Sequence, residues 1–510
     1  MIPALRRRAA AIGPAAPEAG TATGIGRVVS VGGLAVLARR HWLIGVLLLA
    51  GLLLRIAAQL AYRPALFYID TIRYLYSAQG NDPVAYRLPL RGVAEIANLN
   101  AVVLAQHLLG LAMAVAIYVL LVRRGTVRWL AALAAAPVLL DAYQLQAEQT
   151  LMPDVLLEAV IVAGIVALAW RPAATLTSVI AGGLILGCAA PVRQVGEILI
   201  LPALCYVLVA SRGWRSIIRN AAVLCVSFVV PIGIYCTAAY VATGHFWLSH
   251  TGVTTTYGRM AAAADCATLR LPASERGLCP TPAQRALGPD GLEHSPRSPL
   301  RSYYLDSSLP PGRASVLVEN FNRQVLHQQP LNVLHAYAGD AVKLFALTRD
   351  TSPGDTPVSR WQFQARYPFY PPHASRGVVD SAAARFGGGK PAVWRPVADF
   401  LRAYQLNGGY TPGPLFALAV LLGLAGSLTL LRRRRDEAAR QLARACLLFW
   451  VAAVSLLAIS DLFEFSWRYQ LPALVTLPPA AAAGLACLIA ALRRRQAPAA
   501  QAPAAGPDPS

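Results

Sequence analysis

The chain has 510 residues, of which 56% are hydrophobic and 14% are charged, and its mean hydropathy is +0.48. Soluble domains contain roughly 45–50% apolar residues, so this composition excludes a water-soluble globular protein. The net charge of +21 does not indicate nucleic-acid binding, because the arginines gather at the ends of apolar segments, as they do in membrane proteins. Only Lys343 and Lys390 are lysines among the 46 basic residues, which is typical of a GC-rich bacterial genome.

Apolar segments of membrane-spanning length recur along the chain. A bilayer core about 30 Å thick takes roughly 20 apolar residues per helix. The first such run is too long for a signal-peptide core, which predicts a retained anchor. The same length criterion predicts transmembrane helices at 42–61, 98–121, 128–145, 154–170, 174–191, 195–211, 219–243, 412–431, 444–460 and 469–492.

Arginines mark one side of this predicted bundle. They follow the second, fourth, sixth, eighth and tenth helices, for example at Arg123, Arg171 and Arg215. Short cytoplasmic loops carry such an excess of positive charge, so both termini are predicted to be cytoplasmic. The expected fold is therefore an all-α polytopic membrane protein with about ten transmembrane helices, since each apolar run is near the spanning length.

The domain organisation follows from these spans. We expect a large extracytoplasmic loop domain between helices 7 and 8, and termini that are disordered because their composition is biased. The predicted parts are a cytoplasmic N-terminus at 1–40, helices 1–7 within 41–243 with a first outer loop at 62–97, the loop domain at 244–411, helices 8–10 within 412–492, and a cytoplasmic tail at 493–510.

Two features stand out in the predicted loop domain. Cys266 and Cys279 lie in a polar segment and close a short loop, and an oxidising compartment would allow them to form a disulfide. Residues 316–347 form an amphipathic stretch that could lie on the membrane surface.

Acidic residues lie at the predicted outer ends of the helices. Asp70 follows helix 1 among aromatic residues, with Arg73 three residues later. A carboxylate at the membrane boundary can be desolvated and act as a base. The alternative is an ordinary solvated or helix-capping aspartate.

The second outer connection carries three further acids, Glu148, Asp154 and Glu158. Acidic groups that enter an apolar helix are costly and usually functional. Asp154 after Pro153 also fits the start of a helix, so helix capping is the alternative explanation.

Arginines appear in the two remaining short outer connections, against the inside-positive trend. Arg193 stands between two apolar helices, and Arg468 and Tyr469 precede the last one. Arg193 could pair with a carboxylate such as Glu197, or it could bind an anionic head group, because guanidinium matches phosphate oxygens in a bidentate way. Acids and arginines together are the pattern expected of a site that handles a phosphate and needs a base.

Common catalytic motifs are absent from the sequence. It contains no HExxH, GxSxG, Walker A or CxxC motif, and its histidines lack metal-ligand spacing. The sequence therefore gives no support to a metalloprotease, a serine hydrolase or an NTPase, and it predicts no cofactor.

The chain resembles the GT-C superfamily of integral membrane glycosyltransferases in four short features. These are Asp70 in the first outer loop, Pro153–Asp154 in the second, Arg193 in the third and the run RYQLP at the last helix. The similarity is to the branch of the protein O-mannosyltransferases and the lipid A aminoarabinose transferases, and the segments DCATLRLP and LCP look like loops of actinobacterial members. The resemblance implies an inverting hexosyl- or pentosyltransferase that uses a polyprenyl-phosphate-linked sugar donor.

The resemblance also implies roles for particular residues. Asp70 would be the general base and Asp154 the second acidic residue, while Arg193 and Arg468, with Tyr469, would bind the donor phosphate. The supporting candidates are Arg73, Glu148 and Glu158. Thr71 stands where the mannosyltransferase branch has an acidic residue. The resemblance therefore leaves open which class of acceptor is used and whether the reaction depends on a divalent metal.

The expected partners are the donor lipid, a glycan, lipid or protein acceptor, and the bilayer of a bacterial plasma membrane. A transporter or lipid flippase for an envelope precursor is the main alternative, but the polar residues cluster at one face and no inverted repeat is evident. A non-catalytic envelope assembly protein is a further alternative. The sequence does not specify the sugar.

Overall fold

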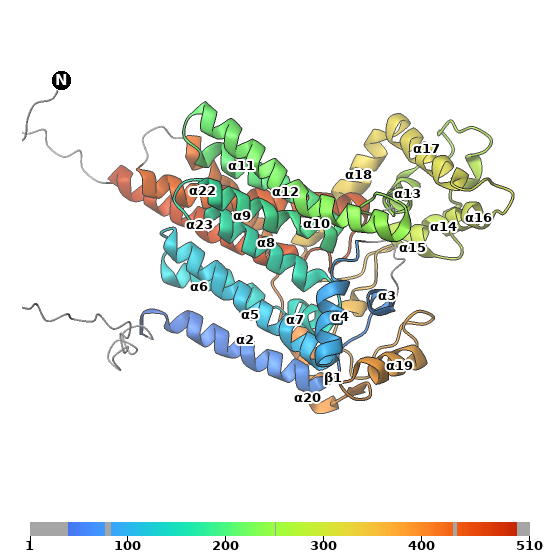
Figure 1. Ribbon diagram of the computed structural model, residues 1–510, viewed down its shortest axis with the longest axis horizontal. Helices are drawn as coiled ribbons and strands as arrows, with labels where there is room; N and C mark the ends of the chain where they lie inside the picture. Colours follow the sequence, from blue (N-terminus) through green and yellow to red (C-terminus); the bar gives the residue numbers. More distant parts are fainter. Residues whose placement is uncertain (1–38, 77–82, 250, 432–435, 497–510) are drawn as a thin grey trace, which may run out of the picture. The chain divides into compact units, whose positions relative to one another are not determined.

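Helices are the main secondary structure of the computed structural model, which describes residues 39–76, 83–249, 251–431 and 436–496 (Figure 1). The chain divides into two units, Met1–Trp42 and Leu43–Ser510, and most of the first lies outside the described residues. The termini predicted to be disordered, 1–40 and 493–510, lie mostly outside them as well. Residues 39–40 and 493–496 are described and helical, so the disorder predicted for these positions is wrong. The description below concerns the second unit.

All ten predicted spans are helical. The first has the predicted bounds, and several others are built from two consecutive helices. The observed elements are α2 (Trp42–Ala61), α5 (Leu99–Arg123), α6 (Arg128–Leu140) with α7 (Ala142–Gln149), α8 (Asp154–Ala169), α9 (Leu176–Gly187) with α10 (Ala189–Val192), η1 (Gln194–Leu199) with α11 (Ile200–Ala210), α12 (Trp214–Thr243), α21 (Gly413–Leu428) with η5 (Thr429–Leu431), α22 (Glu437–Phe463) and α23 (Pro472–Gln496).

Six of these helices are long and apolar enough to cross a bilayer, and the bent pair α6 and α7 makes a seventh candidate. The prediction of an all-α polytopic membrane protein is therefore confirmed. The remaining apolar helices are shorter; α8, for example, has 16 residues, or about 24 Å at 1.5 Å per residue. The count of ten spans stays a prediction.

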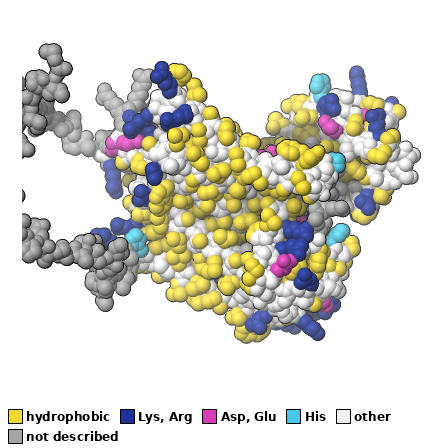
Figure 2. All heavy atoms as spheres, in the orientation of Figure 1, with side chains coloured by type: hydrophobic (Ala, Val, Ile, Leu, Met, Phe, Trp, Pro, Cys, Tyr) yellow, Lys and Arg dark blue, Asp and Glu magenta, His cyan; other side chains and the backbone are white. Residues whose placement is uncertain are grey.

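The packing and the surface of the bundle fit a bilayer. The helices pack as neighbouring pairs, among them α5 with α6, α8 with α9, α9 with α12, and α22 with both α21 and α23. Apolar side chains of α2 and α12 are exposed, for example Leu53 at 58% and Ile234 at 66%. Figure 2 shows hydrophobic side chains covering the flank of the bundle, with basic side chains gathered toward its ends. In water such a surface would be unfavourable, whereas in lipid it is not.

The predicted third span is broken. Asp141 has an extended backbone between α6 and α7, and its carboxylate accepts a hydrogen bond from the backbone N–H of Tyr143, so it caps α7. The same carboxylate pairs with Arg349 at 3.0 Å and accepts a hydrogen bond from the N–H of Thr411 at 2.7 Å. The two helices meet at a bend of 50°.

The first outer loop and the 244–411 segment contribute short elements, which Figure 1 shows gathered at one end of the bundle. These are β1 (Tyr62–Arg63), α3 (Ile69–Tyr76), α4 (Arg87–Ile96), α13 (Gly252–Ala263), η2 (Arg276–Leu278), α14 (Pro282–Arg285), α15 (Gly288–His294), α16 (Pro299–Leu305), α17 (Arg313–Gln328), α18 (Pro330–Ala341), η3 (Lys343–Phe345), η4 (Val358–Trp361), α19 (Arg376–Phe386), β2 (Ala392–Val393) and α20 (Arg395–Leu406).

The segment 244–411 has two differently packed parts. In the first, α13 and α17 pack around a small core that includes Tyr257 and Phe321. A disulfide between Cys266 and Cys279, with Cα atoms 5.9 Å apart, closes a loop beside this core. In the second part, β2 pairs antiparallel with β1, which ties the segment to the C-terminal end of α2.

The amphipathic stretch 316–347 is divided between these environments. The apolar face of α17 is buried in the small core, so this half does not lie on a membrane surface. In α18, Leu331 and Leu334 remain exposed at 76% and 57%. Exposed apolar side chains therefore remain on α18 and beyond it, for example Val342 at 62%, whereas most of the apolar face of α17 is buried.

Candidate active site

Asp154 is the centre of an ion-pair cluster at the start of α8. Its side chain is buried, and its two carboxylate oxygens accept hydrogen bonds from Nε of Arg468 at 3.0 and 2.9 Å. The Nη1 group of Arg193 donates to the same carboxylate. The helix cap is Pro153, without a side-chain cap bond, so the alternative explanation of Asp154 as a helix cap is wrong.

Arg468 connects this cluster to the first outer loop. It lies between α22 and α23, is 7% exposed, and places Nη1 3.8 Å from a carboxylate oxygen of Asp70. Burial alone would lower the pKa of Arg468, but the charge of Asp154 and its other neighbours raises it above its ordinary value. The guanidinium therefore stays charged although it is buried.

Arg193 reaches the cluster from the turn between α10 and η1. Its guanidinium carbon lies 4.8 Å from the ring centre of Tyr469, and that ring is 5.7 Å from the guanidinium carbon of Arg468. The turn is tight: a Cβ on Gly196 would lie 2.4 Å from the carbonyl carbon of Ala189. Glycine at position 196 allows the close approach that turns the chain at Arg193.

Hydrogen bonds between two outer connections place Asp70 beside the cluster. Leu66 pairs with the α7–α8 connection through its N–H to Gln149 and its carbonyl to Leu151. The hydroxyl of Thr71 donates to the carbonyl of Leu151 at 3.0 Å and accepts from the N–H of Tyr68. Thr71, the departure from the family pattern, thus anchors the loop that carries Asp70, whose side chain is 28% exposed.

The structure therefore brings Asp70, Asp154, Arg193, Arg468 and Tyr469 together from four separate connections. The ionised groups balance, with two acids and two arginines. Hydrogen bonds to Asp154 engage Nε of Arg468 and Nη1 of Arg193, so each guanidinium keeps other N–H groups that can donate to an anion. Two arginines with a nearby carboxylate can neutralise a phosphate and accept a proton.

Two of the three supporting candidates, Glu148 and Glu158, lie elsewhere. Glu148 is fully buried in the bundle, where its carboxylate pairs with Nη2 of Arg55 at 2.6 Å and with Nδ1 of His107 at 2.9 Å. Glu158 is also fully buried and accepts a hydrogen bond from Gln144 at 2.7 Å. Arg73 is half-buried on α3. These acids belong to the interior of the bundle and not to the ion-pair cluster at its end.

Arg55 has a structural role at the helix break. Its guanidinium donates to the carbonyl groups of Val138 and Leu139, at 3.0 and 3.1 Å, which lie in the last turn of α6. Carbonyl groups at a helix end lack intrahelical partners and are costly if left unpaired in a membrane. Because Glu148 belongs to α7, the pair Arg55–Glu148 clamps both sides of the bend. A Cβ on Gly110 would lie 2.1 Å from the Glu148 carboxylate, so glycine in α5 makes room for the pair.

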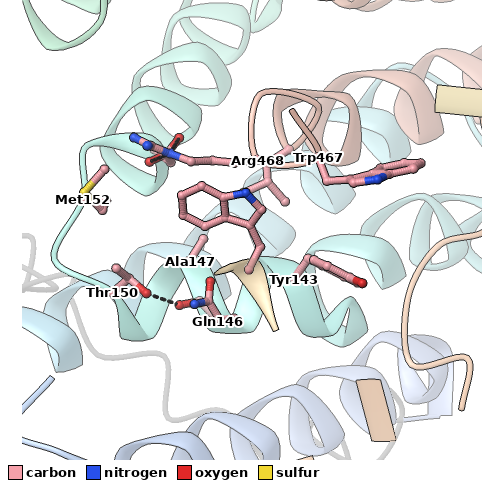
Figure 3. A pocket seen from close by; sticks show the side chains of 10 residues that line it. Tyr143, Gln146, Ala147, Thr150, Met152, Trp467 and Arg468 are labelled. Carbon is pink, nitrogen blue, oxygen red and sulfur yellow. Dashed lines mark hydrogen bonds and ion pairs between the residues drawn. The ribbon is translucent and has the colours of Figure 1, made fainter. Parts of the chain in front are cut away.

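A small pocket opens beside the cluster (Figure 3). Figure 3 shows Tyr143, Gln146 and Ala147 of α7 on one side and Trp467 and Arg468 of the α22–α23 loop on another. Aromatic and polar side chains share the lining, which is typical of small-molecule sites. The lining residues are Tyr143, Gln146, Ala147, Thr150, Met152, Asp154, Trp361, Trp467, Arg468 and Leu471.

No protein-family model matches the chain, and no curated protein matches it. Solved structures that are similar to it include the following two. The Pmt1–Pmt2 protein O-mannosyltransferase complex of S. cerevisiae bound to the sugar donor has 16% identity and a TM-score of 0.32; the match covers 43% of this chain and 36% of that one. ArnT from Cupriavidus metallidurans bound to undecaprenyl phosphate has 15% identity and a TM-score of 0.32, over 90% of this chain and 78% of that one.

Both structures are of GT-C proteins, the superfamily that the sequence motifs resemble. The chain spans about a third of the length of the yeast chain it matches, 36%. At such low TM-scores these likenesses carry no argument about the chemistry, which rests here on the residues of the site.

A metal site is a separate question. Within the described ranges, no three His, Cys, Asp or Glu side chains are grouped so as to hold a metal ion.

Sequence reasoning missed several residues of the site. Trp361 lines the pocket from η4, and its ring lies 5.2 Å from the guanidinium carbon of Arg468. Arg360 donates to the hydroxyl of Tyr68 at 3.2 Å and lies 3.9 Å from Asp290 of α15, so it links the outer segment to the first loop. Nothing in the local sequence marks these residues, because they reach the site only through tertiary packing.

Glu464 also has an unusual environment. It follows the end of α22, and burial together with the nearby charges of Asp290 and Glu293 raises its pKa to about 8. This carboxyl group therefore ionises at a pH within the physiological range. It lies four residues before Arg468 in the chain.

Proposed function

We propose that the chain is a membrane glycosyltransferase that moves a sugar from a polyprenyl-phosphate-linked donor to a cell-envelope acceptor at the outer face of the membrane. The observation that supports this most is the convergence of Asp70, Arg193 and Arg468 around Asp154 at one end of an apolar bundle. The pairing of a carboxylate with two arginines fits a reaction in which a hydroxyl is activated and a phosphate leaves.

In the proposed reaction, Asp70 accepts the proton of the acceptor hydroxyl or orients it. The hydroxyl oxygen forms a bond to the anomeric carbon of the sugar with inversion, and the bond from that carbon to the phosphate oxygen breaks. Arg193 and Arg468 neutralise the charge that develops on the leaving lipid phosphate. Since the donor is already activated, the transfer requires no nucleotide.

Asp154 has a positioning role in this proposal. Its carboxylate holds both arginines by hydrogen bonds, so their geometry is fixed before the donor arrives. Preorganised charges stabilise a transition state without the cost of reorganising during the reaction. Asp154 also competes with the phosphate for the arginines, which would favour release of the product phosphate.

The membrane arrangement supports a lipid donor. The exposed apolar flanks of α2 and α12 would face acyl chains, and the cluster lies at the end of the bundle where the outer segment packs. In this proposal both termini are cytoplasmic, the membrane is a bacterial plasma membrane, and the acceptor is a glycan, a lipid or a protein of the envelope.

One observation favours the alternative of a transporter or flippase. The ionisable residues Arg55, His107 and Glu148 are buried together inside the bundle, and such groups often serve ion or substrate coupling. Arg55, however, also stabilises the carbonyl groups at the end of α6, which explains its presence structurally. A glycosyltransferase function therefore explains more of the polar residues than a transporter function does.

The deciding experiment measures sugar transfer by the purified protein in proteoliposomes that contain labelled polyprenyl-phosphate sugars and envelope acceptors. Asp70→Asn should lower transfer by about a hundredfold or more, because general-base catalysis is worth 10²–10⁴-fold. Asp399→Asn on the exposed face of α20 is the matched control and should retain activity.

Full transfer by Asp70→Asn would remove the proposed base. Flux of lipid across the vesicle without any transfer would support the transporter instead. For the phosphate site, Arg193→Ala should weaken donor binding, while Arg301→Ala on the outer segment should not. Unchanged donor affinity in both Arg193→Ala and Arg468→Ala would contradict the phosphate assignment.

A further inference from the structure

The C-terminal end of α22 lies directly before the loop that carries Arg468. The helix ends at Phe463, and Glu464 after it has an extended backbone, with φ of −158° and ψ of 158°. The last four carbonyl groups of an α-helix have no partner within the helix, and a buried carbonyl group without a partner is costly. The end of α22 therefore needs hydrogen-bond donors from other parts of the chain.

Arg259 of α13 supplies these donors. Its Nε group donates to the carbonyl groups of Leu462 at 3.3 Å and Phe463 at 3.1 Å, and its Nη2 group donates to the carbonyl of Asp461 at 2.9 Å. Arg259 is 3% exposed, and its positive charge lies at the negative end of the helix dipole. One side chain of the 244–411 segment thus satisfies three of the last four carbonyl groups of α22.

Acidic and basic side chains of the same segment hold Arg259 in place. Its Nη2 group also donates to the carboxylate of Asp340 in α18. Lys343 pairs with Asp340 at 2.7 Å and with Asp355 at 2.7 Å. A planar guanidinium can donate in several directions at once, so Arg259 joins α13, α18 and the end of α22 through one group.

The loop after α22 is closed at its base by a hydrogen bond. The amide of Gln470 donates to the carboxylate of Asp461 at 2.8 Å, across nine positions of the chain. Arg468 and Tyr469 lie within this loop, and Asp461 belongs to the turn of α22 that Arg259 caps. The position of Arg468 therefore depends on how the end of α22 is held.

From these contacts we propose, on the basis of the proposed glycosyltransferase function, that Arg259 is a positioning residue for Arg468. It acts through the end of α22 and not by contact with the donor. The alignment that it protects is the pair of hydrogen bonds from Nε of Arg468 to Asp154, at 3.0 and 2.9 Å. Misplacing a reacting or binding group by about 1 Å can lower a rate by about a hundredfold. The 244–411 segment thereby completes the support of the phosphate site.

A variant of Arg259 should still fold. In Arg259→Gln, Asp340 keeps Lys343 as its ion-pair partner at 2.7 Å, so this buried carboxylate is not left unpaired. The small core that includes Tyr257 and Phe321 does not contain Arg259. The effect of the substitution on the site can therefore be measured in folded protein.

The test measures the binding of undecaprenyl phosphate to the purified protein in nanodiscs, because Arg468 would bind the phosphate of such a lipid. Arg259→Gln should weaken this affinity by about tenfold, the value of about one charge-assisted hydrogen bond. Arg259→Lys keeps the charge but not the planar fork, so its affinity should lie between those of Arg259→Gln and the unaltered protein. The matched control is Arg301→Gln on the exposed surface of α16, which should bind like the unaltered protein.

A double variant distinguishes positioning from a general loss of stability. If Arg259 acts through Arg468, Arg259→Gln combined with Arg468→Ala should bind no more weakly than Arg468→Ala alone. Losses that multiply in the double variant would show that Arg259 acts in another way and would overturn the inference. Unchanged affinity in folded Arg259→Gln would overturn it as well.

The same measurements separate this inference from the proposed function. If the unaltered protein does not bind undecaprenyl phosphate, both the phosphate site and the positioning role are rejected. If it binds the lipid and responds to Arg259→Gln but transfers no sugar, the glycosyltransferase function fails while the positioning of Arg468 is supported. If Arg259→Gln does not fold, Arg259→Lys, alone and combined with Arg468→Ala, provides the same comparison.

Discussion

Replacing Arg55 by methionine probes the clamp at the bend between α6 and α7. The methionine keeps much of the side-chain volume, but it leaves Glu148, which is fully buried, without its 2.6 Å partner. It also leaves the carbonyl groups of Val138 and Leu139 without a donor. Removing one member of a buried ion pair costs about 3–5 kcal/mol, and each unpaired carbonyl adds about 1–3 kcal/mol.

The expected loss of unfolding free energy in Arg55→Met is about 4 kcal/mol, since His107 still hydrogen-bonds to Glu148 and the terms are not additive. The assay is denaturant unfolding in detergent micelles for Arg55→Met, Glu148→Gln and the double variant. The double variant should lose less than the sum of the single losses, because it has no unpaired buried charge. Transfer activity should fall with the single variants, because α7 supplies Tyr143 and Gln146 to the pocket.

The exposed pair Arg91–Glu95 on α4 is the matched control. Exposed pairs contribute little to stability, so Arg91→Met and Glu95→Gln should leave unfolding almost unchanged. The reasoning is refuted if Arg55→Met unfolds like the unaltered protein, or if the losses of the two single variants simply add.

Three further predictions concern the site and the outer segment. Asp154→Asn should lower kcat by about tenfold or more without raising the KM for the donor. The two arginines would lose the alignment that the carboxylate gives them, but they would be freer to bind phosphate. An unchanged kcat would contradict the positioning role of Asp154. The pKa of Glu464 is raised to about 8, so the folded state binds more protons than the unfolded state between the ordinary pKa of a glutamate and that value. The free energy of unfolding should therefore fall as the pH rises toward 8, and Glu464→Gln should flatten this dependence; identical pH profiles would show that Glu464 is not the group responsible. Cys266 and Cys279, with a sequence separation of 13, should not react with thiol reagents in unreduced cells. Reduction of the disulfide opens the loop that it closes and should lower the free energy of unfolding by about 3 kcal/mol. Labelling of both thiols without reduction would exclude the disulfide.

Local sequence was enough to locate the apolar helices of the bundle. The 42–61 span coincides with α2, and the other predicted spans are helical, because each run of apolar residues must satisfy its backbone hydrogen bonds internally in a bilayer. The break at Asp141 was missed although Asp141 is a good helix cap. Its cause is tertiary, since Arg349 and Thr411, both far along the chain, stabilise the carboxylate there.

The charged residues of the site could also be chosen from the sequence. Asp70, Asp154, Arg193 and Arg468 each stand out as ionisable groups at the ends of apolar segments, where they are costly unless they have a partner or a function. Which of them pair was not predictable: Arg193 binds Asp154, whereas the sequence analysis suggested a carboxylate such as Glu197 or an anionic head group. The sequence also did not show that Glu148 points into the bundle and pairs with Arg55.

The sequence by itself thus determined the membrane character of the protein, the location of its helices and the charged residues from which a site can be built. These follow from composition and from the short-range requirements of a helix in lipid. Only the tertiary structure decided the ion-pair partners, the clamp at the bend, and the contribution of Trp361 to a pocket that also contains Gln146. Such contacts join residues far apart in the chain, from 39 positions for Arg193 and Asp154 to 314 for Arg468 and Asp154. They depend on how whole helices pack, which no local pattern of apolar and charged residues specifies.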